Sequence, residues 1–186
     1  PILIRRVDIR IAVGLGLVIM ASAAYMETDL TLASSGPNFT VSQLLRGVGQ
    51  ILGMLFLSQA VVQSVPPEDA GDASGLYNAM RNLGGSFALA GISILQQDRS
   101  WLHARRLEET LSANAPAVQD YVAGVSRTIG GPEAGMRLIG QQIQGQALVM
   151  TYNDIFFVMS VVTISVLPLV LFLRPLPRNA ASGAMH

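Results

Sequence analysis

The sequence predicts an all-α membrane protein, a bundle of about four transmembrane helices with a small helical loop outside the membrane. Its hydrophobic fraction is 51% and its charged fraction only 13%, whereas soluble domains carry about 25% charged residues. Residues 155–173 contain no charge, and a helix of this length spans about 28 Å, close to the hydrocarbon thickness of a bilayer. Two further apolar segments, separated by a polar turn, lie near the N-terminus.

The last predicted span covers residues 147–173. Arg174 and Arg178 follow it directly, as expected for residues that stop a helix at the membrane interface. Pro168 lies inside the span, and membrane helices tolerate proline. A buried helix of a soluble protein is the alternative, and the length of the uncharged run disfavours it.

The first two predicted spans cover residues 11–30 and 41–65. The Ser, Gly, Pro and Asn residues between them are typical of a loop. Gly49 and Gly53 form a G-x-x-x-G pattern, which allows close approach of a neighbouring helix. The alternative is a chance pair in a glycine-rich chain.

A third span is predicted at residues 70–95, after the break at Pro66 and Pro67. It is the least hydrophobic of the four, and its position between the other spans favours a helix that faces the interior of the bundle. Ser74, Asn78, Arg81 and Gly85 recur at a spacing that places them on one helix face, and Asn82 flanks that face.

This polar face is the main candidate site in the sequence. A charge that faces lipid costs about 2.5–3.5 kcal/mol, so Arg81 is expected to face the interior or a water-filled path. Two interpretations are open, a lining of a translocation path or an internal hydrogen-bond network that holds helices together. Gly85 is a further predicted packing position.

Two other charged residues are candidates for the same path. Arg46 lies about a turn and a half into its span, and its alternative role is to extend its charge to the membrane interface. Asp154 enters the last span, where it either titrates or pairs with an arginine, or simply begins the helix at the interface.

Residues 98–145 differ in composition, because they carry charges of both signs. Residues 100–112 have the pattern of an amphipathic helix. Pro116 and Pro132 stand where new helices can begin, and the glycines at 130–131 mark a break between them. We therefore expect a small helical element outside the membrane.

Several function classes are disfavoured. The formal net charge is zero, so no overall field attracts nucleic acid. The chain has no Cys and two His residues, and it lacks nucleophile, zinc and nucleotide-binding motifs. We expect no metal, no cofactor and no enzymatic activity.

Five segments together resemble one known family. They are LIRRVDIR at 3–10, QLLRGVG at 43–49, PPEDAGDASGLYNAMRNLGGS at 66–86, WLHAR at 101–105, and the run from 146 to 156. In this order they are similar to late segments of the 14-helix major facilitator drug:proton antiporters of the EmrB/QacA type. The segment at 66–86 resembles the region that joins the twelfth and thirteenth helices of that family.

The resemblance implies that the chain is the last part of a major facilitator fold, a C-terminal fragment with the final four helices. It implies a bacterial inner-membrane transporter with cytoplasmic termini that exports hydrophobic or amphipathic drugs in exchange for protons. EmrB-like members work with a periplasmic adaptor and an outer-membrane channel. The motifs of the family's first half are absent, so we expect no coupled transport by this segment alone.

The arginine counts tie at five on each side of the membrane. One set of five lies in a long loop, and charges in long loops influence orientation less, so the arginines weakly favour cytoplasmic termini. The chain begins with Pro1, which fits a truncated or processed chain. The alternative function is a non-transporting membrane subunit or scaffold, but such a protein has little need of an arginine at the middle of the membrane.

Overall fold

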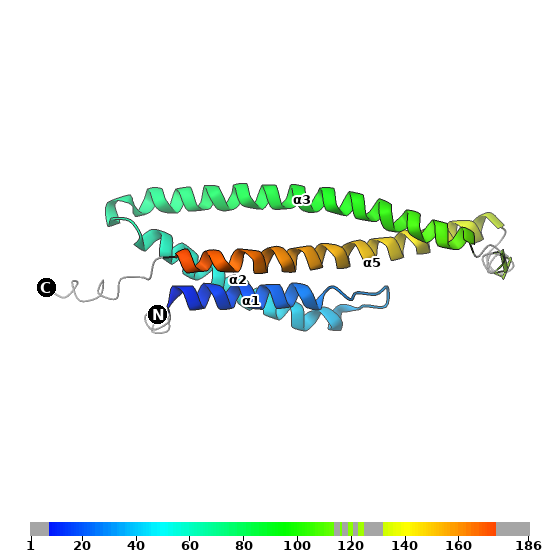
Figure 1. Ribbon diagram of the computed structural model, residues 1–186, viewed down its shortest axis with the longest axis horizontal. Helices are drawn as coiled ribbons and strands as arrows, with labels where there is room; N and C mark the ends of the chain where they lie inside the picture. Colours follow the sequence, from blue (N-terminus) through cyan, green and yellow to red (C-terminus); the bar gives the residue numbers. More distant parts are fainter. Residues whose placement is uncertain (1–7, 114–115, 117–118, 121–122, 125–131, 174–186) are drawn as a thin grey trace. The chain divides into compact units, whose positions relative to one another are not determined.

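The computed structural model describes residues 8–113, 116, 119–120, 123–124 and 132–173. The helices are α1 (Ile9–Met26), α2 (Gly36–Gln63), α3 (Ala70–Ala113) and α5 (Pro132–Val166), with short 3₁₀ helices η1 (Pro67–Asp69) and η2 (Leu167–Phe172). The described residues contain no strand, and the all-α class is confirmed (Figure 1).

The chain divides into two compact units. Unit 1 holds the described residues of 1–27, 36–89 and 157–186, and unit 2 holds those of 28–35 and 90–156. Because α3 and α5 run through both units, each helix contributes one part to unit 1 and another to unit 2.

Helix α1 begins at a polar cap. The side chain of Asp8 accepts a hydrogen bond from the backbone N–H of Arg10 at 3.0 Å, which satisfies a donor that the first helical turn leaves free. The helix ends at Met26, before the predicted end at residue 30, because the backbone N–H of Glu27 turns back to the carbonyls of Ala24 and Tyr25.

Helices α1 and α2 form an antiparallel hairpin in unit 1. A Cβ atom added at Gly49 would lie 2.7 Å from the carbonyl oxygen of Gly16, and one added at Gly16 would lie 2.9 Å from backbone atoms of Gly49 and Gly53. Because real Cβ atoms do not approach so closely, the crossing requires glycine at positions 16 and 49. Apart from its own helix backbone and chain neighbours, nothing described lies within 4 Å of an added Cβ at Gly53 or Gly85, so a requirement for glycine at these two positions stays a prediction.

The core of unit 1 lies between α1, α2 and η2. Its buried members are apolar: Ile9, Ala12, Val13, Phe56 and Val170. Two hydrogen bonds join α1 to the C-terminal part of the chain, from Arg10 Nε to the carbonyl of Leu173 at 2.7 Å and from Ser160 Oγ to the carbonyl of Ala21 at 3.0 Å.

Helix α3 is one unbroken helix of 44 residues, whereas the sequence predicts a span at 70–95 and a separate helix at 100–112. No proline interrupts residues 70–113, and glycines in a helix interior weaken the helix without ending it. At 1.5 Å per residue its length is about 66 Å, more than twice the thickness of a bilayer's hydrocarbon core.

Helix α5 is also longer than the predicted span at 147–173, and it begins at Pro132, a predicted helix start. The α-helical hydrogen bonding changes to 3₁₀ at Leu167, where Pro168 supplies no N–H group. The predicted break at 130–131 and the arginines at 174 and 178 lie outside the described residues.

Three segments of the described chain are long and apolar enough to cross a membrane: Ile9–Met26, Gly36–Gln63 and Gly135–Phe172. Helix α3 does not reach this hydropathy, because its first half carries Asp72, Arg81 and several amides. The predicted span at 70–95 therefore stays a prediction.

Candidate functional site

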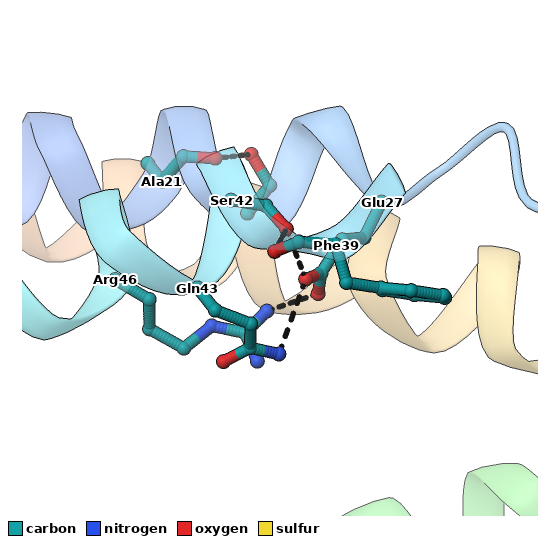
Figure 2. Close-up of polar contacts among 7 residues, drawn as sticks. Ala21, Glu27, Phe39, Ser42, Gln43 and Arg46 are labelled. Atoms are coloured by element: carbon teal, nitrogen blue, oxygen red, sulfur yellow. Dashed lines mark hydrogen bonds and ion pairs between the residues drawn. The ribbon is translucent and has the colours of Figure 1, made fainter. Parts of the chain in front are cut away.

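Glu27 is a buried carboxylate at the end of α1. Its residue is 2% exposed, and Figure 2 shows that the carboxylate meets three side chains of α2, Ser42, Gln43 and Arg46. Ser42 Oγ donates to Oε1 at 2.6 Å, Gln43 Nε2 lies 3.5 Å from the same oxygen, and Arg46 forms an ion pair with Oε2.

The local sequence explains this convergence. Because α1 ends at Met26, the Glu27 side chain turns toward the neighbouring helix rather than continuing along α1. Ser42 and Arg46 are four residues apart and so share a helix face. A buried charge is strongly unfavourable unless it is paired and hydrogen-bonded, and both conditions are met here. The cluster joins the two helices next to the turn of the hairpin.

The sequence left two roles open for Arg46, a place in a translocation path or a charge extended to the membrane interface, and the ion pair with Glu27 is relevant to both. Its side chain is 28% exposed, and its guanidinium points to Glu27 within unit 1 (Figure 2). Sequence reasoning missed Glu27 as a partner. Part of the signal was available, because an arginine in an apolar span needs a counter-charge and two acids, Glu27 and Asp29, precede the predicted loop. A role for Arg46 in a translocation path stays a prediction.

A second polar cluster lies in unit 2, around Asp154 of α5. His103 Nε2 lies 2.8 Å from Asp154 Oδ2, and Arg99 Nη1 lies 3.5 Å from the same oxygen. His103 and Arg99 are four residues apart on α3 and face α5 together. Pairing with an arginine was one of the roles considered for Asp154, whereas His103 was not considered as a partner. An acid and a histidine on adjacent helices give no periodic signal in a sequence.

Exposure differs among the three residues of this cluster. The side chain of His103 is 8% exposed, that of Asp154 is 35% exposed and that of Arg99 is 44% exposed. The buried imidazole therefore meets a carboxylate that reaches solvent on its other side.

The predicted polar face of α3 lies in unit 1. Ser74 is half-buried, and Asn78, Arg81, Asn82 and Gly85 are exposed. Among the described residues, no ion pair or hydrogen bond joins the guanidinium of Arg81 to another side chain. Within the described ranges, the structure thus brings Arg46 and Asp154 into polar clusters but gives Arg81 no such partner.

Large apolar side chains on the same part of α3 are exposed as well: Leu76, Met80, Leu83 and Phe87 are 53–78% exposed. Both the polar and the apolar sides of this half of the helix are therefore open in the part of the chain that the structure describes.

Among all the residues that the structure describes, no group of three or more His, Cys, Asp or Glu side chains is arranged to hold a metal ion.

Comparison with known proteins finds similar multidrug export and resistance proteins. The chain is 26% identical over 155 residues to the colistin resistance protein EmrB of Acinetobacter baumannii. This alignment covers 83% of this chain and 29% of that protein. It is 28% identical over 144 residues to the multidrug export protein EmrB of Escherichia coli K12, covering 76% of this chain and 27% of the relative.

A third relative is the fatty acid resistance protein FarB of Neisseria gonorrhoeae, 24% identical over 178 residues, or 96% of this chain and 35% of the relative. The chain thus spans about a third or less of the length of these relatives. No protein-family profile and no solved structure matches it.

Proposed function

Because the chain belongs to the EmrB-type drug exporters of the major facilitator superfamily, we propose that it forms the last four membrane-spanning helices of a proton-driven exporter of hydrophobic or amphipathic drugs. The observation that carries the proposal is the alignment of 76% of the chain with the multidrug export protein EmrB of Escherichia coli K12. It confirms the resemblance inferred from the five sequence segments. Three apolar helices of membrane-spanning length agree with it.

The surface of α3 supports a larger bundle around this chain. Residues 70–89 expose both polar and apolar side chains, and an exposed Arg81 in a lipid environment would cost about 2.5–3.5 kcal/mol. Helices outside this chain would cover that face and give Arg81 a partner or a water-filled path. Ser74, Asn78, Arg81 and Asn82 are the residues that we propose for the path.

The proposed orientation places both termini in the cytoplasm. If residues 70–95 also cross the membrane, the second half of α3 and the first half of α5 extend from the membrane face opposite to the termini. Each helix is too long to be contained in the bilayer. In a Gram-negative cell this side is the periplasm, where we propose that the protein meets an adaptor leading to an outer-membrane channel.

The proposal is tested by drug export from cells that lack their own exporters. The full coding sequence that contains this chain is expressed, and efflux of a fluorescent amphipathic cation is followed with and without a protonophore. We expect export that stops when the proton gradient collapses. Export that continues without a proton gradient would contradict the coupling, and absence of export of any drug tested would contradict the function.

A matched control is residues 1–186 expressed alone. We expect this segment to insert into membranes and to confer no resistance, because the rest of the pathway and the motifs of the first half are absent from it. Resistance equal to that of the full protein would contradict the assignment of this chain to part of a pathway.

A further inference from the structure

The ring of His103 has one satisfied and one unsatisfied nitrogen. Nε2 lies 2.8 Å from Asp154 Oδ2. Nδ1 is buried and has no hydrogen-bond partner among the described residues. Leaving a buried polar atom without a partner costs about 1–3 kcal/mol, so this nitrogen calls for a functional explanation.

The contact with Asp154 sets the tautomer. An ionised carboxylate can only accept hydrogen bonds, and Oδ2 of Asp154 also receives Arg99 Nη1 at 3.5 Å. Nε2 of His103 must therefore carry the hydrogen that it shares with Asp154. The neutral ring then has a bare lone pair on Nδ1, an acceptor with no donor.

We propose that His103 and Asp154 form a proton-binding site between α3 and α5, in which Nδ1 of His103 takes up a proton. One proton adds to the lone pair of Nδ1, the Nε2–H bond to Asp154 stays intact, and no other bond forms or breaks. The ring charge rises from zero to plus one. The assignment of this proton to the drug-export cycle rests on the proposed function, whereas the site itself rests on the geometry.

The charges around the ring decide what protonation does. In the described part of unit 2, Asp154 faces the ring from α5, and Arg99 approaches the same carboxylate from α3. Asp29, in the segment 28–35 that contacts α5 through Leu30 and Asn153, is exposed.

An imidazolium bonded to a carboxylate makes a charge-assisted hydrogen bond, about twice as strong as a neutral one. Arg99 opposes this gain because both cations share one acceptor oxygen. Its opposition is the smaller effect, because Arg99 is 44% exposed and lies 3.5 Å from that oxygen, against 2.8 Å for His103. Proton uptake is therefore expected to tighten the contact between the two helices, and proton release to loosen it.

The position of the site along the helices suits proton exchange. Asp154 immediately precedes the apolar run 155–173, and His103 lies eight residues beyond the predicted end of the span at 95, about 12 Å along the helix axis. Asp154 thus lies in the first third of the predicted span 147–173, directly before its uncharged run, and is 35% exposed. Histidine is also the side chain whose ordinary titration falls between about pH 5 and 8.

The test is nuclear magnetic resonance of the full-length protein with ¹⁵N-labelled histidine, in which the His103 signals are identified by their loss in His103→Gln. Gln places an amide N–H near the position of Nε2 but cannot take up a proton. We expect the Nε2–H tautomer at about pH 8 and protonation of Nδ1 as the pH is lowered to about 5. A ring that stays neutral over this range, or that carries its hydrogen on Nδ1, would overturn the proposal.

Two variants separate the site from general effects on the fold. Asp154→Asn removes the acceptor-only carboxylate that fixes the hydrogen on Nε2, so the Nε2–H tautomer should no longer dominate. Arg105→Gln removes an exposed cation on the same helix, whose partner is Glu109, and should leave the tautomer unchanged. Equal effects of the two variants would also overturn the proposal.

The outcome is independent of the transport assay, because the spectrum requires no export. A protein that exports no drug but protonates His103 contradicts the proposed function alone. A protein that exports drug while His103 stays neutral contradicts the proton site alone. In a protein that does both, His103→Gln should lose the dependence of export on external pH, and an unchanged pH profile would remove His103 from the export cycle.

Discussion

Removing the carboxylate of Glu27 should destabilise the α1–α2 hairpin. Glu27→Ala takes away the Ser42 hydrogen bond at 2.6 Å and leaves Arg46, which is 28% exposed, without its counter-charge. Breaking a buried pair by removing one partner costs about 3–5 kcal/mol. Because Arg46 keeps some contact with its surroundings, we expect a loss of about 3 kcal/mol, at the lower end of that range.

A double-mutant cycle separates the pair from the rest of the hairpin. Glu27→Ala, Arg46→Ala and the double variant should give a coupling energy of about 2 kcal/mol, because once one charge is gone the other no longer stabilises the fold. The control is the exposed pair Arg105–Glu109, at 3.3 Å with side chains 61% and 68% exposed. Its coupling should stay below about 0.5 kcal/mol.

The assay is single-molecule forced unfolding of the full-length protein from a bilayer, which resolves helical hairpins as separate steps. The free energy of the step that extracts α1 and α2 is compared among the variants. If the coupling energy between Glu27 and Arg46 is no larger than that of the Arg105–Glu109 control, the ion pair does not stabilise the hairpin, and its proposed role is refuted.

Two further predictions concern the crossing of the hairpin and the polar face of α3. Gly49→Ala should cost about 1–3 kcal/mol in the same unfolding step, because its Cβ would meet the backbone of α1 at 2.7 Å. Gly53→Ala is the control, because its Cβ has open space and the change should be nearly neutral. Equal losses of stability for the two variants would argue against the close crossing. Arg81→Ala should reduce drug export more than Arg137→Ala at matched abundance in the membrane, with Arg81→Lys rescuing only in part because it lacks the planar guanidinium. Normal export by Arg81→Ala would exclude the polar face from the pathway, and a collapse in its abundance would favour the packing role.

The apolar helices could be predicted because hydropathy and helix breakers act locally. The apolar runs and the glycine and proline residues between them carry the information for α1 and α2, and Pro132 marks the start of α5. The continuity of α3 through residues 95–100 was not predicted. A change from apolar to charged composition marks a change of surroundings, but it does not end a helix unless a breaker accompanies it.

The partners of the polar residues were harder to predict, because they depend on which helix faces pair in space. The need of Arg46 for a counter-charge could be stated from the sequence, but its pairing with Glu27 depends on where α1 ends and how the hairpin crosses at Gly49. The contact of His103 with Asp154 joins residues 51 positions apart, and no local pattern links them. Tertiary packing, rather than periodicity, creates both clusters.

The central claim is that residues 70–95 also cross the membrane, which gives this chain four spans, although their composition is less apolar than that of the other three. The most direct measurement is a pair of reporter fusions to the full-length protein, one inserted after Gly131 and one after His186, using a reporter that is active only outside the cytoplasm. With four spans, the account predicts activity at Gly131 and none at His186. If residues 70–95 do not cross, the chain has three spans, Gly131 lies in the cytoplasm and His186 lies outside it. Reporter activity at His186, or its absence at Gly131, would therefore contradict the account.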